Sequence, residues 1–186
     1  MAYIVIPQPS MACHAYNVPG WKYQMHNTWP MSADEEMQHI ADWTTSVAKG
    51  AGGLKCLIFN SHGSCGRAAL SKKAALQETE AAKFTQIKGN VKHIIIVACS
   101  VIGVKPGQND KFWKDHGVQM CYALARESGA RVYAANVSQY VNVLASIFGG
   151  GGDIDDFEGD ILCMPPSGTA SWVPSNDALQ LMLKNT

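Results

Sequence analysis

Two short apolar stretches decide the fold, and each runs directly into a residue with chemical reactivity. Residues 56–63 read CLIFNSHG, and residues 94–99 read IIIVAC. Both stretches are continuously apolar, a pattern typical of strands that are buried on both faces of a parallel sheet. The first ends at His62 and the second at Cys99. The pattern therefore predicts two buried strands whose carboxyl ends carry a histidine and a cysteine.

Helices and further strands are predicted around this pair. The sequence SADE at 32–35 is typical of a capping box, and an apolar stripe at helical spacing follows it up to Gly50. Strands are expected near 3–6, 131–135 and 160–164, helices near 77–88 and 118–128, a hairpin at 67–73 and a long loop at 7–31. Strands that alternate with amphipathic helices indicate the α/β class. We expect one domain, residues 1–186, built as a three-layer αβα sandwich with a mostly parallel central sheet.

The order and spacing of the histidine and the cysteine suggest a shared site. Cys99 follows His62 by 37 residues (99 − 62), which is room for one helical crossover between neighbouring parallel strands. Functional crevices in such sheets lie beyond the carboxyl ends of the strands. A cysteine needs a base to become a thiolate nucleophile, and a histidine can take and return that proton. The amides of Gly63 and Cys99 are candidate donors of an oxyanion hole.

These motifs resemble those of the clan CD cysteine peptidases, which share the caspase–hemoglobinase fold. The resemblance rests on an apolar block followed by His-Gly and a second apolar block followed by Ala-Cys, in that order, and the plausible overlap runs from about residue 3 to residue 164. It implies a caspase-like sandwich in which His62 is the general base, Cys99 is the nucleophile, and Gly63 with the Cys99 amide forms the oxyanion hole. Many members have a glycine two or three residues after the cysteine, whereas here Gly103 comes later.

Acidic residues are concentrated in one glycine-led segment, Gly149–Asp160. Five of the fifteen acids lie within residues 153–160. A flexible, solvated loop is the favoured interpretation. Two other interpretations stay open. In the first, Asp153, Asp155 and Asp156 line a pocket for a basic substrate side chain. In the second, the loop binds calcium, although the spacing of its acids does not match an EF-hand.

The remaining cysteines and histidines favour no metal or cofactor. Cys65 lies three residues after His62, but a closed zinc site needs four ligands and no second short-spaced pair accompanies it apart from the distant residues 13–14. A disulfide between Cys65 and Cys99 is an alternative suggested by position alone. Cys56, Cys121 and Cys163 lie in apolar patterns and are expected in the core.

Composition excludes several classes of protein. Fifteen basic residues balance fifteen acidic ones, and charged residues make up 16% of the 186, against roughly 25% in an average soluble domain. Disorder and a dedicated nucleic-acid binder are therefore disfavoured. The longest apolar run is shorter than the ~20 residues that span a bilayer. Without a signal-peptide pattern, we expect a cytoplasmic protein, or one exported without a cleavable signal, as a bacterial effector can be.

The sequence thus predicts a thiol hydrolase, an endopeptidase that acts on a peptide or protein through a Cys99–His62 dyad and a thioester acyl-enzyme. One alternative is a catalytically silent caspase-like scaffold that binds a partner protein; the late Gly103 and the short chain motivate it. An amidase or acyltransferase using the same dyad is a third possibility.

Overall fold

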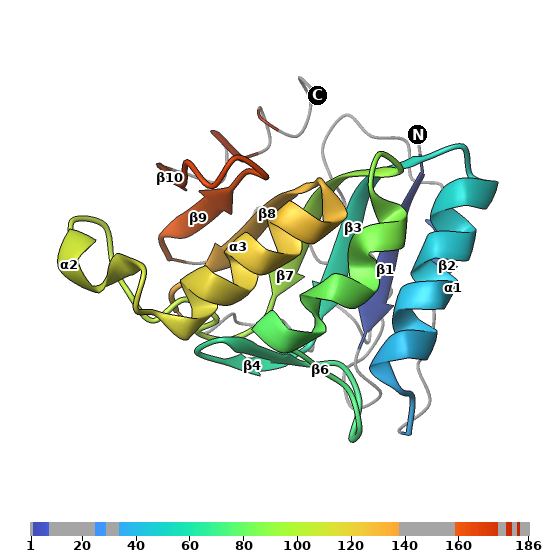
Figure 1. Ribbon diagram of the computed structural model, residues 1–186, viewed down its shortest axis with the longest axis horizontal. Coiled ribbons are helices and arrows are strands. Elements are labelled where there is room, and N and C mark those ends of the chain that lie inside the picture. The colour runs from blue at the N-terminus through green and yellow to red at the C-terminus, as the bar shows by residue number, and fades with distance from the viewer. Residues whose placement is uncertain are drawn as a thin grey trace, which may run out of the picture.

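A seven-stranded sheet forms the centre of the described part of the chain. The computed structural model describes residues 2–7, 25–28, 34–137, 159–174, 178, 179 and 182. Within them the strand order is β10-β9-β8-β7-β3-β1-β2 (Figure 1). The strands are β1 (Ala2–Pro7), β2 (Met25–Thr28), β3 (Leu54–Asn60), β7 (Val91–Val97), β8 (Arg131–Ala135), β9 (Ile161–Met164) and β10 (Ser171–Val173).

Most of this sheet is parallel. Strands β2, β1, β3, β7 and β8 run in one direction, whereas β9 is antiparallel to β8 and β10 is antiparallel to β9. The predicted α/β class with a mostly parallel sheet is therefore confirmed. Strand β2 lies within the segment 7–31 that was expected to be a loop, and β10 was not expected; residues 8–24 lie outside the described part of the chain.

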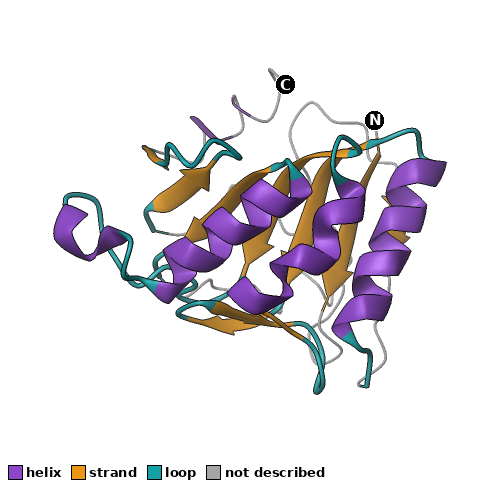
Figure 2. Ribbon diagram, viewed as in Figure 1, coloured by secondary structure: helices purple, strands orange, loops and turns teal. Residues whose placement is uncertain are grey.

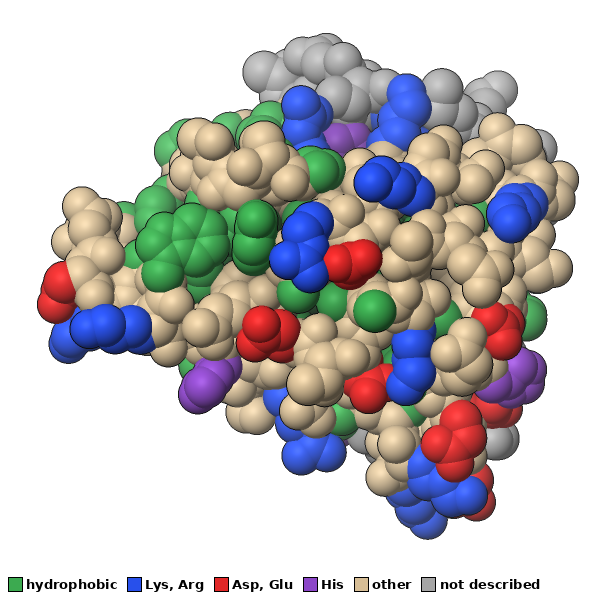
Figure 3. Space-filling model, viewed as in Figure 1, with side chains coloured by type: hydrophobic (Ala, Val, Ile, Leu, Met, Phe, Trp, Pro, Cys, Tyr) green, Lys and Arg blue, Asp and Glu red, His purple; other side chains and the backbone are tan. Residues whose placement is uncertain are grey.

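The longer helices of the described chain cover one face of the sheet. They are α1 (Met37–Gly50), the 3-10 helix η1 (Glu78–Ile87) and α3 (His116–Ser128), with the short α2 (Asn109–Phe112) beyond the N-terminal start of α3 (Figures 1 and 2). Phe59 of β3 packs edge-on against Phe84 of η1, with ring centroids 5.7 Å apart. Charged side chains of both signs are interspersed over this helical face (Figure 3).

The strand side chains alternate between two hydrophobic clusters. Leu57, Phe59 and Ile94 belong to the cluster that includes the helices, whereas Ile58 and Ile95 belong to a second cluster on the other side of the sheet. Leu179 and Tyr133 are buried in that second cluster. The strands are therefore buried on both faces, which explains their continuous apolar sequences.

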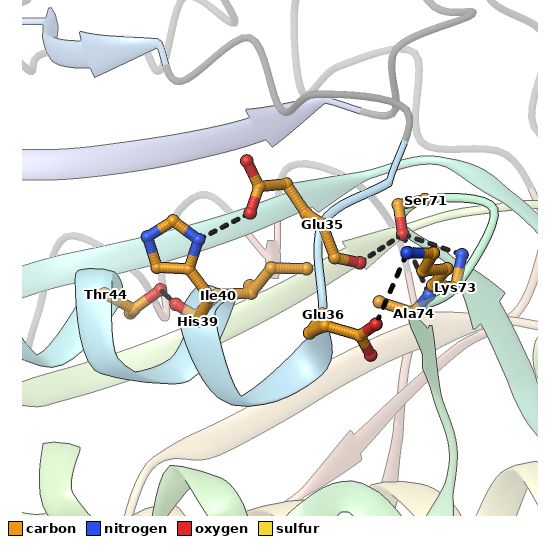
Figure 4. Close-up of polar contacts among 8 residues, drawn as sticks. All are labelled: Glu35, Glu36, His39, Ile40, Thr44, Ser71, Lys73 and Ala74. Atoms are coloured by element: carbon orange, nitrogen blue, oxygen red, sulfur yellow. Dashed lines mark hydrogen bonds and ion pairs between the residues drawn. The ribbon is translucent and has the colours of Figure 1, made fainter.

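Helix α1 begins later than the sequence predicted. Its N-cap is Glu36, without a side-chain hydrogen bond, so the capping box expected at 32–35 is wrong. The Glu35 carboxylate instead pairs with His39 Nδ1 at 2.5 Å, and the Glu35 carbonyl accepts a 2.6 Å hydrogen bond from Ser71 Oγ (Figure 4). Tertiary contact with the Ser71 turn has displaced the local capping pattern; the end of the helix at Gly50 agrees with prediction.

The other two long helices agree in position. Segment 78–87 forms a 3-10 helix rather than an α-helix, and its buried residues Ala81, Phe84 and Ile87 are three apart, which is the repeat of a 3-10 turn. Helix α3 ends at Gly129, which has a φ of +70° and whose backbone amide donates a hydrogen bond to the Ala125 carbonyl. Together these form a left-handed cap.

A small antiparallel sheet follows β3 directly. Its strands are β4 (His62–Ser64), β5 (Arg67–Ala69) and β6 (Ala75–Leu76), in the order β4-β5-β6. The hairpin predicted at 67–73 thus becomes the β5–β6 pair, and His62 opens the first strand. Among the described residues, no helix combines the length and the apolar character needed to cross a bilayer.

Candidate active site at the ends of two parallel strands

The register of β3 and β7 determines where the histidine and the cysteine leave the sheet. The two strands are hydrogen-bonded neighbours, with Asn60 opposite Val97. The Ser61 amide donates to the Val97 carbonyl at 3.0 Å, so the pairing continues one residue past the strand. His62 and Cys99 each follow two residues after this last pair. The prediction that the two strands are adjacent, and that both residues leave the same edge, is confirmed.

Gly63 brings the histidine segment against the cysteine segment. A Cβ atom at Gly63 would lie 2.8 Å from both the Ala98 Cβ and the Cys99 carbonyl oxygen. Non-bonded carbon atoms prefer about 3.5–4.0 Å, so a side chain does not fit there. Strand β4 therefore lies directly on the backbone of Cys99, and the absence of a side chain at Gly63 has a steric cause in addition to the backbone-donor role that we predicted.

Two of the described cysteines are accessible, and three are not. Cys99 is partly buried and Cys65 is exposed, both as free thiols, whereas Cys56, Cys121 and Cys163 are buried. Burial raises the pKa of the Cys56, Cys121 and Cys163 thiols. The expected core placement of those three is confirmed, and their protonated thiols are poor nucleophiles. His62, on β4, is exposed.

The turn after Cys99 has an unusual backbone conformation. Ser100 has a φ of +47°, the one positive φ of a non-glycine residue within the described segments. Its amide donates to the Val137 carbonyl at 2.9 Å, and the Ile102 amide donates to the Ala135 carbonyl at 3.1 Å. Such conformations persist only where the surroundings hold them, and they cluster at functional sites. Here bonds to the end of β8 hold the turn that follows the candidate nucleophile.

Sequence reasoning missed Asp115, which lies beside both segments. Its carboxylate accepts hydrogen bonds from the Cys65 thiol at 3.3 Å and from the Gly103 amide at 3.0 Å. The position of an aspartate just before an apolar helical run signals an N-cap, and Asp115 does cap α3. Nothing local signals its link to Cys65, fifty residues away.

The acidic segment is only partly described. Asp153, Asp155 and Asp156 lie outside the described residues, so neither the pocket for a basic side chain nor the calcium interpretation is tested. Asp160 is described. Its backbone amide donates a hydrogen bond to the Asn136 side-chain oxygen, and its carboxylate accepts one from the Asn136 side-chain nitrogen. In the described ranges, no group of three or more histidine, cysteine or acidic residues is arranged to hold a metal ion.

Comparison with known proteins returned no relative: no family model, no curated protein and no solved structure matches the chain.

Proposed function

We propose that the chain is a thiol hydrolase, an endopeptidase acting on a peptide or protein substrate, with Cys99 as the nucleophile and His62 as the general base. The observation that carries this proposal is the β3–β7 register, which makes both residues leave one sheet edge two positions after the Asn60–Val97 pair. The close approach of Gly63 to the Cys99 carbonyl supports it, because it leaves little space between the two segments. The accessibility of Cys99 is a third support.

In the proposed reaction, the His62 imidazole takes the proton of the Cys99 thiol as the sulfur attacks the substrate carbonyl carbon. The C–S bond forms, and the amides of Gly63 and Cys99 donate to the resulting oxyanion. His62 then gives the proton to the leaving amine as the C–N bond breaks. Water, deprotonated by His62, cleaves the thioester and regenerates the thiol.

We also propose that the domain is a caspase-like three-layer sandwich. The support is the second hydrophobic cluster, in which Ile58, Ile95 and Tyr133 are buried on the face opposite α1, η1 and α3. Leu179 belongs to this cluster, and Ala178 and Met182 pack against it, so these three residues contribute to covering that face.

The test measures hydrolysis of a mixed peptide library, together with labelling of the protein by an acyloxymethyl ketone. Cys99→Ala is expected to abolish both, because it removes the nucleophile. His62→Gln is expected to slow both by at least about a hundredfold, the lower range for a general base. His39→Gln is the matched control, since His39 is an exposed histidine of α1 that faces Glu35.

Equal hydrolysis and labelling of wild type and Cys99→Ala would remove Cys99 from the reaction. If wild type hydrolyses no peptide of the library, and Cys99 is alkylated at the same rate in wild type and in His62→Gln, the results favour the silent scaffold. Transfer of the acyl group to an added amine instead of to water would favour the acyltransferase.

A further inference from the structure

One carboxylate joins the segment after His62, the loop after Cys99 and the start of a helix. Asp115 Oδ1 accepts from the Val118 amide at 3.0 Å, which is the N-cap bond of α3. Asp115 Oδ2 accepts from the Gly103 amide at 3.0 Å and from the Cys65 thiol at 3.3 Å. The carboxylate therefore binds three segments that are far apart in the sequence.

Close backbone packing accompanies these hydrogen bonds. The Gly66 amide donates to the Val101 carbonyl at 3.0 Å, which joins the β4–β5 turn directly to the loop after Cys99. A Cβ atom at Gly117 would lie 1.9 Å from the Val101 oxygen, and one at Gly103 would lie 2.5 Å from Asp115 Oδ2. Only glycine fits at position 117, where the neighbour is a backbone oxygen, whereas a Cβ at position 103 would push against the Asp115 and Cys65 side chains themselves. The three segments are therefore in direct contact. We name these contacts around the Asp115 carboxylate the Asp115 clamp.

The chemistry of Cys65 suits a hydrogen-bond donor. Burial raises the pKa of this thiol, and the Asp115 carboxylate raises it further, although the amides of Gly117 and His116 act in the opposite direction. The thiol therefore keeps its proton near neutral pH and donates it to the carboxylate. This separates the function of Cys65 from that proposed for Cys99, because only a thiolate is a good nucleophile.

We propose that Asp115 is a positioning residue for the Cys99–His62 pair, and that the Cys65 thiol is the link through which it holds the histidine-bearing strand. The inference rests on the proposed function. Cys65 is three residues after His62 and Gly103 is four residues after Cys99, so one carboxylate holds the chain shortly after each of the two proposed reactive residues. Asp115 does not itself touch the reacting atoms in this proposal.

The experiment compares variants that remove or keep the thiol's donor. Cys65→Ala removes it, and we expect kcat for peptide hydrolysis to fall about tenfold with KM unchanged, because a hydrogen bond to a charged group is lost. Exchange of the Gly66 amide with solvent should accelerate by at least about tenfold, since its bond to Val101 is no longer supported. Cys65→Ser keeps a donor and should bring both quantities back to within about threefold of wild type.

Asp115→Ser separates positioning from helix capping. Serine still caps α3, but its shorter side chain does not reach Cys65 and Gly103 together, so we expect a loss of kcat like that of Cys65→Ala. Asp110→Ser, at an exposed acid of α2, is the matched control and should leave kcat unchanged. Far-UV circular dichroism on every variant checks that the overall helix content is that of wild type.

The two proposals fail in different ways. If Cys99→Ala abolishes hydrolysis but Cys65→Ala matches wild type in kcat and in Gly66 exchange, the Asp115 clamp is not a positioning device and the hydrolase proposal stands. Equal impairment of Cys65→Ser and Cys65→Ala also overturns the clamp, because the donor is then irrelevant. Undiminished hydrolysis by Cys99→Ala overturns both proposals.

Discussion

Gly63→Ala directly tests the contact between β4 and the Cys99 segment. The added methyl group would lie 2.8 Å from the Ala98 Cβ and 2.8 Å from the Cys99 carbonyl oxygen. The first distance is roughly 0.7 Å shorter than the closest separation that non-bonded carbon atoms prefer. The φ of Gly63 is not in the left-handed region, so the cost is steric and not conformational. The Cys99 segment has little freedom to move away, because the Ser61–Val97 and Ser100–Val137 hydrogen bonds hold the chain on either side of the contact.

Overpacking of this kind costs about 1–3 kcal/mol, and we expect Gly63→Ala to lower the free energy of unfolding by about 2 kcal/mol. Urea unfolding followed by far-UV circular dichroism measures it. Displacement of β4 should also move His62, the proposed base, away from Cys99 and so slow the alkylation of Cys99 by iodoacetamide. Peptide mass spectrometry measures that alkylation. Gly50→Ala is the control, because a Cβ there meets no atom within 4 Å. A Gly63→Ala protein with unchanged stability and unchanged Cys99 alkylation would refute the close contact.

Four further substitutions, at three positions, test other parts of the structure by urea unfolding. Ser100→Gly should leave the free energy of unfolding within about 1 kcal/mol of wild type, whereas Ser100→Val should lower it by about 1–2 kcal/mol, because the φ of +47° disfavours a β-branched side chain; equal stability of the two variants would contradict this. Gly117→Ala should cost about 3 kcal/mol, since its Cβ would overlap the Val101 oxygen. The pKa of His93 is lowered to about 4, mainly by burial and further by the positive charges of Arg131, Lys55 and Lys92. The unfolded chain then binds a proton between pH 6.5 and 4 that the folded chain does not, so stability should fall as the pH drops, by about 2 kcal/mol from pH 7 to pH 5. His93→Gln should lose that part of the pH dependence.

The elements predicted well from sequence are those whose signal is carried by their own residues. Strand β8 and helix α3 agree because a continuous apolar run and a terminal Gly129 are local features. The start of α1 was wrong because the Glu35 carboxylate and carbonyl bind His39 and Ser71, and the latter is 36 residues away. The 3-10 form of η1 was missed because apolar residues three apart also fit an α-helix.

The candidate site could also be predicted only in part, namely where its signal is carried by neighbouring residues. The sequence shows two similar apolar runs, the first ending at the histidine and the second at the cysteine. These features were enough to predict that both residues leave the same edge of the sheet. Asp115 could not be found, because its partners Cys65 and Gly103 come together only when β4 and the loop after Cys99 meet the start of α3. A hydrogen-bond hub that joins distant segments leaves no periodic pattern in the sequence.

The late glycine after Cys99 has a structural cause that bears on the choice between an enzyme and a silent scaffold. In this chain the left-handed turn next to Cys99 is formed by Ser100, held by its bond to Val137. Close approach is instead required at Gly103, where a Cβ would lie 2.5 Å from Asp115 Oδ2 and 3.0 Å from Cys65 Sγ. The glycine therefore lies where a side chain would have to displace the Asp115 carboxylate and the Cys65 thiol, and the turn beside Cys99 is formed without it. The packing of this chain thus accounts for the position of Gly103, and the choice between an enzyme and a silent scaffold depends on the reactivity of the Cys99 thiol in wild type and in His62→Gln.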